Sequence, residues 1–491
     1  MSADCLLAID QGTTSSRAVI VGPSGTIIAD HRCEFPQHYP RPGWVEHDLE
    51  DLWDSVVSSV TGAIAKLPGG WNRIAALGVT NQRETIGVWE RRSSRPVSRA
   101  IVWQCRRTAE MCDILRRDHA EALHRLTGLT VDPYFSGPKL RWLLDNTPGL
   151  RGRIGELAAG TIDTWVVWKL TGGAQHLTDP TNACRTMLYD LDQRAWSPEL
   201  LDLMDLPREI LPQVVASGGR FGETAPCEGI PGGIPICAVM GDQQSALFGQ
   251  GGVEAGQAKN TYGTGCFLLA NTGRSRVDSR AGLLSTLACD ATGSPCYALE
   301  GSVFVAGAAV QWLRDELGVI SSSAEVETLA ASVPDTAGVS FVPAFVGLGA
   351  PYWDAGARGA LLGLTRGAGR AHLARAALEA IAHQSVDVLE AMATDGAEVV
   401  QLRVDGGASR NNLLMQIQAD LAGLTVLRPQ EVEMTALGAA YLAGISAGLW
   451  TDPWSASEGL DRFEPRLTEA ERVERRSRWR DAVARVRSNQ R

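Results

Sequence analysis

The sequence is poor in features that would place it in a simple structural class. Its ten cysteines include no Cys-x-x-Cys pair, which argues against both a disulfide framework and a zinc site. No apolar run reaches the roughly 18 residues of a membrane-spanning helix. The first ten residues also lack the charged start and cleavage site of a signal peptide. We therefore expect a cytoplasmic protein without membrane insertion.

Lysine is also scarce, and acidic residues outnumber basic ones. The net charge is −10, and among the basic residues only four are lysines: Lys66, Lys139, Lys169 and Lys259. No overall positive field draws the chain to nucleic acid, so we expect no nucleic-acid partner. Apolar residues make up 44% of the 491 and charged residues 21%, as in soluble globular proteins. This length suggests two to four domains or subdomains at roughly 150 residues each.

Two common catalytic motifs are absent and a third is matched by chance. No Gly-Lys dipeptide occurs, so there is no Walker A loop, and the eight histidines never form His-Glu-x-x-His. The string 444–448 fits Gly-x-Ser-x-Gly, but 436–444 has the small residues of a helix and no histidine follows His383. A nucleophile elbow requires a preceding strand and a later histidine. We predict that this string is a plain helix end.

The two halves of the chain show related patterns. In the first half, turn residues separate three short strands predicted at 5–9, 18–21 and 26–28, which form an antiparallel meander. In the second half, a strand at 258–262 returns at 266–270 through Gly263-Thr264-Gly265. Further helices are predicted from the caps Asp48, Asn411 and Thr468. We predict two α/β domains, at 1–247 and 248–491.

The two hairpin tips are candidate phosphate-binding loops. Glycine lets backbone N–H groups approach a phosphate closely, and Thr or Ser hydroxyls add donors. The first tip offers Thr13, Thr14 and Ser15 with Arg17 beyond them, and the second offers Thr264. Asp10, at the strand end beside the first tip, is placed to hold Mg²⁺. One such turn is typical of an ordinary hairpin, whereas two at equivalent places favour a phosphate clamp.

Charged residues at two further strand ends suggest catalysis and polyol binding. Asp242 follows the apolar run 234–240 and suits a general base or metal ligand, although a helix N-cap fits equally well. The Arg83 guanidinium is a hydrogen-bond donor and the Glu84 carboxylate is an acceptor, a combination that suits two neighbouring hydroxyls of a polyol. The alternative is an ion pair on the protein surface. Three aromatic residues that are more typical of a core could wall a small carbon skeleton: Trp103, Tyr134 and Phe267.

Seven strings together resemble the glycerol kinases of the carbohydrate-kinase family. They are the strings at 10–17, 81–85, 103–107, 132–136, 241–244, 260–267 and 405–408. The likeness runs from about Leu6 to about Trp450, and the joint match is highly specific. It implies an α/β fold of two ribonuclease-H-like, or actin-like ATPase, domains with the active site in the cleft between them. It also implies ATP-dependent phosphorylation of glycerol to sn-glycerol 3-phosphate with Mg²⁺, in glycerol catabolism.

The resemblance assigns roles to individual positions. Glycerol hydroxyls are bound by Arg83, Glu84, Tyr134, Asp242 and Gln243, and the carbon chain is flanked by Trp103 and Phe267. Phosphates are contacted by Thr13, Thr14, Ser15, Arg17 and Thr264. The nucleoside pocket is lined by Gly307, Gln311, Gly407 and Asn411. Asp242 is the expected base, and Asp10 and Asp242 are the candidate Mg²⁺ ligands.

The chain departs from some family members where they are regulated. The stretch 227–233 has no basic residue for fructose 1,6-bisphosphate, and no phosphorylatable histidine lies between His176 and His372. The tail does not match the segment that binds the glucose-specific phosphotransferase protein. We expect all three forms of regulation to be absent. We also expect a homo-oligomer, either a dimer or a tetramer. Two alternatives are a kinase for another short polyol or ketose and a non-catalytic actin-like nucleotide-binding protein.

Overall fold

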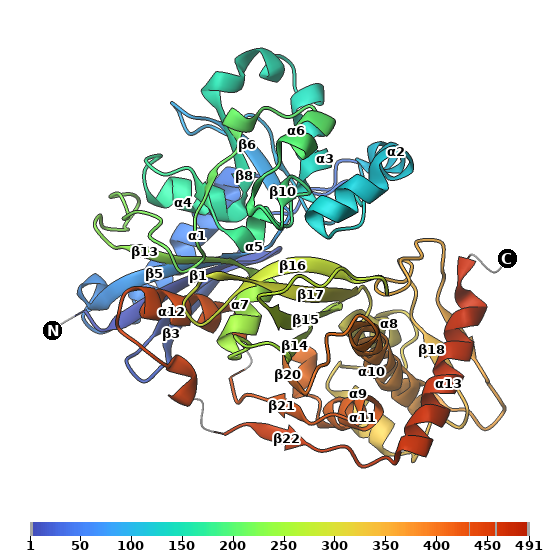
Figure 1. The fold of residues 1–491 in the computed structure, drawn as a ribbon. Coiled ribbons are helices and arrows are strands. Elements are labelled where there is room, and N and C mark those ends of the chain that lie inside the picture. Colours follow the sequence, from blue (N-terminus) through green and yellow to red (C-terminus); the bar gives the residue numbers. More distant parts are fainter. Residues whose placement is uncertain (1–2, 432, 457–458, 489–491) are drawn as a thin grey trace.

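The first of two large sheets begins with the predicted antiparallel meander. A computed structural model describes residues 3–431, 433–456 and 459–488 (Figure 1). The sheet order is β3-β2-β1-β5-β13, in which β5 and β13 run parallel to β1. Its strands are β1 (Cys5–Gln11), β2 (Ser15–Val21), β3 (Ile27–Glu34), β5 (Ile74–Asn81) and β13 (Ile236–Gly241). We call this sheet and the elements packed on it the first lobe.

The second sheet repeats this order with two extra strands. Its order is β16-β17-β15-β14-β20-β21-β22, and β14-β15-β17 is again an antiparallel meander followed by parallel β20 and β21. The strands are β14 (Gln257–Tyr262), β15 (Cys266–Gly273), β16 (Leu284–Cys289), β17 (Pro295–Val303), β20 (Gln401–Asp405), β21 (Val426–Arg428) and β22 (Asp461–Phe463). This sheet and its helices form the second lobe. Two sheets of this order are the expected actin-like pair.

Helices cover both sheets (Figure 1). A smaller region, formed mainly by elements that lie between β5 and β13 in the chain, extends the first lobe. The helices are α1 (Leu49–Ile64), α2 (Ala109–Thr127), α3 (Ser136–Asn146), α4 (Ile162–Leu170), α5 (Pro180–Ala183), α6 (Pro198–Leu203), α7 (Asp242–Gly249), α8 (Gly307–Asp315), α9 (Glu325–Ala331), α10 (Arg370–Thr394), α11 (Asn412–Ala422), α12 (Met434–Ser446) and α13 (Glu469–Val486). Short strands are β4 (Glu46–His47), β6 (Ile86–Glu90), β7 (Ala100–Ile101), β8 (Leu157–Thr161), β9 (Leu177–Thr178), β10 (Tyr189–Asp190), β11 (Ala195–Trp196), β12 (Gln213–Val214), β18 (Ser340–Val342) and β19 (Ala360–Leu362). No helix in the described part of the chain has the length and apolarity to cross a bilayer.

Helix α12, although late in the chain, packs on the first sheet. It contacts β1, β5 and β13 on one side and α7 along its length. Gly438 permits this approach, because a Cβ there would collide with the carbonyl oxygen of Ser245 in α7. Helix α7 in turn contacts β14, β15 and β16, so it joins the lobes. The predicted boundary between residues 247 and 248 falls inside α7 and stays a prediction.

Local sequence signals explain where several helices begin. The Asp48 carboxylate accepts from the Glu50 N–H at 2.9 Å, and the Asn411 side chain accepts from Leu414 N at 2.8 Å. Thr468 forms the predicted capping box at the start of α13. Each side chain satisfies an N–H that the first helical turn leaves without a partner. The chance Gly-x-Ser-x-Gly match is the end of α12, as predicted, and the Ser446 hydroxyl donates to the Gly218 carbonyl.

Candidate active site between the two lobes

Three parallel strands of the first sheet deliver the acidic residues to one edge. In the register of β1, β5 and β13, Asp10 lies beside Thr80, and Thr80 lies beside Met240. The chain leaves β13 at Gly241 and enters α7 at Asp242. Side chains at the carboxyl ends of neighbouring parallel strands meet at one edge of the sheet, where ligands of open α/β sheets bind. The structure therefore brings Asp10 and Asp242 together, as the sequence predicted.

Burial and the charge of Asp242 both affect the ionisation of Asp10. Burial raises the pKa of Asp10 to about 7, and the negative charges of Asp242 and Glu433 add to this, against the opposing effect of Arg17. Burial also raises the pKa of Asp242, although Arg83 and Lys259 favour its charged form. A buried carboxyl whose charged form is disfavoured by a neighbouring carboxylate lies in a region that would gain from a bound cation.

A magnesium ion fits this pair only together with other ligands. Among the described residues, no group of three or more His, Cys, Asp or Glu side chains is arranged to hold a metal. Mg²⁺ typically uses one or two protein carboxylates and completes its shell with water and substrate phosphates. Asp10 and Asp242 match that donor set, so their chemistry suits a magnesium–nucleotide rather than a resident structural metal.

The first hairpin tip is joined to the predicted glycerol wall by hydrogen bonds. The Trp103 indole N–H donates to the Thr13 hydroxyl at 3.0 Å, and its backbone N–H donates to the Thr85 hydroxyl at 3.2 Å. The Thr85 hydroxyl donates to Gln82 Oε1 at 2.9 Å, and Gln82 Nε2 donates to the Gly12 carbonyl at 3.1 Å. This closed ring fixes the phosphate tip relative to the aromatic wall. No role was predicted for Gln82.

The other residues of the first tip differ in exposure. Thr14 is exposed, whereas Ser15 is buried and its hydroxyl accepts from Arg32 Nε at 2.7 Å. Arg17 lies opposite Asp10 in the β1–β2 ladder. Its guanidinium pairs with Asp30 at 2.8 Å and with Glu433 at 2.5 Å. Thus Arg17 reaches the acidic edge, but two carboxylates already contact it.

Arg83 and Glu84 form a buried pair rather than a surface ion pair. Both are 2% exposed, so the alternative of a solvated surface pair is wrong. Arg83 Nε lies 3.8 Å from Glu84 Oε1 and 3.2 Å from Asp242 Oδ1. Glu84 has φ +62°, an unfavourable backbone conformation for a residue with a Cβ. Its carbonyl is held there by Ser136 Oγ at 3.0 Å and Lys139 Nζ at 3.2 Å.

Three buried charged residues near this pair were not predicted as site residues from the sequence. Arg185 Nε donates to Glu84 Oε1 at 2.7 Å, and Glu300 Oε2 accepts from Arg83 Nη1 at 2.6 Å. Lys259 donates to the Gln243 side chain and to Thr261 Oγ1, and burial lowers the lysine pKa to about 8. Glu300 interrupts the apolar run of β17, a signal that could have found it, whereas Lys259 stands in a largely polar strand. Arg185 follows the short helix α5 and has no such signal.

The aromatic residues divide between the two lobes. Trp103 and Tyr134 meet edge to face with ring centroids 5.7 Å apart, and the Arg185 guanidinium lies 5.6 Å from the Tyr134 ring. Phe267 lies on β15 opposite Thr261 and Ser302. Trp103 and Tyr134 thus adjoin the buried charges, while Phe267 stands on the second sheet.

The second hairpin tip is tied to the start of α8. The Gly307 N–H donates to the Gly263 carbonyl at 3.0 Å, and the Thr264 carbonyl accepts from Ala306 N at 2.8 Å. A Cβ at Gly307 would lie 2.6 Å from the Gly263 oxygen, so only glycine permits this contact without a shift. Thr264 itself is exposed. Of the other predicted nucleoside residues, Gln311 is exposed on α8, and Gly407 and Asn411 follow β20.

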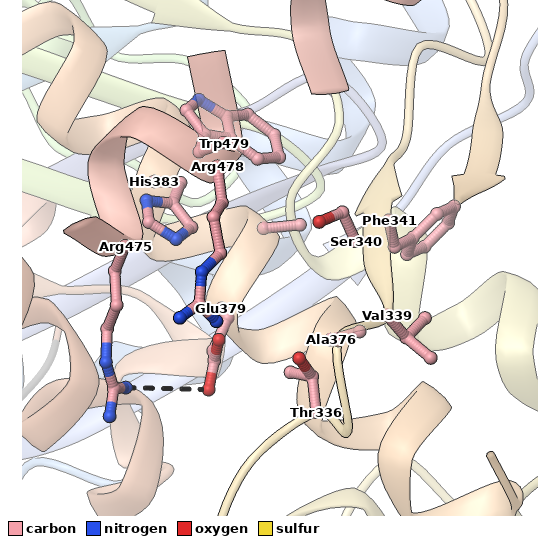
Figure 2. Close-up of a pocket in the computed structure, with 12 residues that line it drawn as sticks. Thr336, Val339, Ser340, Phe341, Ala376, Glu379, His383, Arg475, Arg478 and Trp479 are labelled. Atoms are coloured by element: carbon pink, nitrogen blue, oxygen red, sulfur yellow. Dashed lines mark ion pairs between the residues drawn. The ribbon is translucent and has the colours of Figure 1, made fainter. Parts of the chain in front are cut away.

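A small cavity elsewhere in the second lobe is not part of this site. Figure 2 shows it between α10, α13 and the strand β18, with Arg475 directed toward Glu379. Its volume is about 50 Å³, and His383 stacks on Trp479 at its wall. That space suits ordered water, which occupies roughly 30 Å³ per molecule in the liquid, and none of the predicted site residues lines it.

Comparisons with known proteins agree with this architecture. The N-terminal domain of the FGGY family of carbohydrate kinases matches residues 5–249, and its C-terminal domain matches 258–447. The glycerol kinase of Alkalilimnicola ehrlichii is 54% identical over 485 residues, covering 98% of each chain. That of Deinococcus radiodurans is 52% identical over 489 residues, covering 98% of this chain and 97% of its own.

Solved structures give the same result. The crystal structure of Plasmodium falciparum glycerol kinase with ADP superposes with a TM-score of 0.93 at 33% identity, over 99% of this chain and 98% of that one. The ligand-bound xylulose kinase of Lactobacillus acidophilus shares the fold, with a TM-score of 0.88 at 21% identity over 99% and 100% of the two chains. The predicted two-domain, actin-like α/β fold is confirmed. The chain belongs to the FGGY family of carbohydrate kinases.

Proposed function

We propose that this protein transfers the γ-phosphoryl group of ATP to glycerol, forming sn-glycerol 3-phosphate and ADP in glycerol catabolism. The observation that carries the proposal is the identity of 52–55% with relatives named glycerol kinase over nearly the whole length of both chains. The buried charges beside Asp242 are consistent with it, because they supply paired donors and acceptors of the kind that a polyol requires.

Glycerol binding is assigned to the residues around Arg83. Arg83 donates to one hydroxyl and Glu84 accepts from its neighbour, while Trp103 and Phe267 flank the carbon chain and Tyr134 and Gln243 complete the set. Arg83 Nε is buried and makes no hydrogen bond among the described residues, although it lies 3.2 Å from Asp242 Oδ1. An unused buried donor is costly. A substrate hydroxyl oxygen would satisfy it.

Asp242 is assigned as the base of the reaction. Its side chain is 31% exposed, so a substrate hydroxyl has access to it, and its Oδ1 accepts from the Gln243 N–H at 2.7 Å. Phosphoryl transfer through a loose transition state depends mainly on positioning and charge neutralisation. Asp242 orients the terminal hydroxyl toward the γ-phosphorus and takes its proton. The Lys259 and Arg83 charges favour the ionised form of this carboxyl, whereas burial raises its pKa.

The phosphates are assigned to the two hairpin tips. Thr13, Thr14, Ser15 and Arg17 serve from the first lobe and Thr264 from the second, with the nucleoside beside Gly307, Gln311, Gly407 and Asn411. Asp10 and Asp242 would hold Mg²⁺, which supplies charge neutralisation on the phosphates when bound. We also propose a cytoplasmic homo-oligomer without the fructose 1,6-bisphosphate control.

A substrate panel tests the function. ADP formation is followed with glycerol, dihydroxyacetone, erythritol and xylulose as separate acceptors. We expect the highest kcat/KM with glycerol and formation of sn-glycerol 3-phosphate. A higher value with xylulose or erythritol would instead assign the chain to another polyol or ketose. ATP binding without turnover on any acceptor would indicate a non-catalytic nucleotide-binding protein.

A further inference from the structure

Glu300 is a carboxylate of the second lobe that reaches into the glycerol-binding charges of the first lobe. It is fully buried on β17, where its neighbours across the sheet are Leu269 and Leu284. Its two oxygens face the Arg83 guanidinium as a fork, with Oε2 accepting from Nη1 at 2.6 Å and Oε1 from Nη2 at 2.9 Å. A strand paired on both sides is a rigid support. It fixes both the position and the plane of the arginine.

The remaining contacts of Arg83 show why its orientation depends on Glu300. Gln244 Oε1 accepts from Nη1 at 3.2 Å, and two further carboxylates lie near Nε, Asp242 at 3.2 Å and Glu84 at 3.8 Å. Among the residues that the structure describes, only Glu300 holds both terminal nitrogens at once. Without its charge, the guanidinium is drawn toward Asp242, which then loses its access to a substrate hydroxyl.

The buried cluster is balanced in charge. Arg83 and Arg185 offset Glu84 and Glu300, and Arg185 contacts both carboxylates, at 2.7 Å and 3.2 Å. The two arginines hold the pKa of Glu300 near 2, whereas burial outweighs them at Glu84 and raises its pKa. Glu300 is therefore the carboxylate that neutralises the arginines.

We propose that Glu300 is a positioning residue, which holds Arg83 from the second lobe in the orientation that binds a glycerol hydroxyl. This inference rests on the proposed function. It also means that the first lobe alone does not contain a complete glycerol subsite, because the counter-charge of its arginine comes from the other sheet.

The test compares Glu300→Gln and Glu300→Asp with the wild-type protein. In Glu300→Gln the shape is kept and the charge is lost, so we expect KM for glycerol to rise by about 10- to 100-fold. KM for ATP should stay within about twofold, since the nucleotide contacts are unchanged. Glu300→Asp keeps the charge on a shorter side chain and should give an intermediate glycerol KM. It also serves as the test if the glutamine variant does not fold.

The matched control is Asp387→Asn, which removes the charge of another buried carboxylate. Asp387 on α10 pairs with Arg476 and accepts from the Trp479 indole at 2.8 Å, where α10 meets α13. It should lower Tm as the Glu300 variants do, but leave KM for glycerol unchanged. Equal glycerol KM values in wild type and a folded Glu300 variant would overturn the positioning role. A wild-type protein that does not phosphorylate glycerol would overturn the proposed function instead.

Discussion

The two sheets share a strand order but place their acidic residues differently at equivalent positions. In the first sheet Asp10 on the hairpin strand β1 lies beside Thr80 on the parallel strand β5. In the second sheet Thr261 on β14 lies beside Asp405 on β20, so threonine and aspartate have exchanged places. Opposite them in the hairpins stand Arg17 in the first sheet and Phe267 in the second.

The exchange gives the two edges different electrostatics. In the first sheet, Asp10 faces the charges of Asp242 and Glu433, and its pKa rises to about 7. In the second, burial raises the pKa of Asp405, but the nearby Lys259 favours the charged form of that carboxyl. The first edge is therefore suited to an external cation, whereas in the second edge Lys259 lies near the carboxylate of Asp405. A shared topology sets where side chains gather, and their chemistry sets what the site binds.

The largest effect is expected from Asp242→Asn. The amide cannot accept the hydroxyl proton, so kcat should fall by about 10²- to 10⁴-fold. ADP affinity, measured by titration calorimetry, should remain within a few-fold of the wild-type value. A variant with near-normal kcat would remove the base assignment.

A comparison of Asp10→Asn with Asp405→Asn tests the difference between the sheets. Asp10→Asn should raise the Mg²⁺ concentration needed for half-maximal activity by about 10- to 100-fold, because a ligand of the metal or of its bound water is lost. Asp405→Asn should leave that concentration unchanged, since Lys259 already neutralises the second edge. The measurement is a magnesium titration at constant free ATP. An equal rise in the half-maximal Mg²⁺ concentration in the two variants would show that the two sheet edges do not differ in metal binding.

Gly307→Ala tests the second hairpin tip. The added methyl would lie 2.6 Å from the Gly263 carbonyl oxygen and displace the tip. We expect KM for ATP to rise by about tenfold with little change in KM for glycerol. Gly369→Ala, where a Cβ meets nothing within 4 Å, is the matched control and should change neither value. An unchanged KM for ATP in Gly307→Ala would argue against this tip as a phosphate contact.

The smallest effect concerns the stability of the ligand-free protein as a function of pH. Because the pKa of Asp10 is raised to about 7, the folded state binds an extra proton between about pH 4 and pH 7. The free energy of unfolding therefore falls as pH rises through that range. The Asp10→Asn variant lacks this decrease in the free energy of unfolding. Compared with wild type, the free energy of unfolding of the variant should therefore increase by about 1 kcal/mol between pH 5 and pH 8.

Thermal or urea unfolding at the two pH values measures this difference. Asp405→Asn provides the comparison on the second sheet, where Lys259 offsets part of the burial cost. A pH-independent difference between Asp10→Asn and wild type would contradict the raised pKa of Asp10.

Several parts of the site could be predicted because their signals are local. The tip residues Thr13 and Thr264 stand in short hairpins, and Asp10 and Asp242 stand at the ends of apolar strands. The meeting of the two acids was implied by the family resemblance, and the parallel register of β1, β5 and β13 supplies its physical reason. The alternatives left open at Arg83 and Glu84 needed burial to decide, because a sequence does not show whether an ion pair faces water.

The sequence by itself determined the hairpins, the helix caps and the acidic strand ends, since hydrogen bonds and side-chain periodicity act over a few residues. Only the tertiary structure decided that α12 returns to cover the first sheet and that Glu300 holds Arg83. Arg83 and Glu300 are 217 positions apart in the chain. Their contact depends on how two sheets pack together, and the buried charges are stable there because each finds an opposite charge as water is excluded.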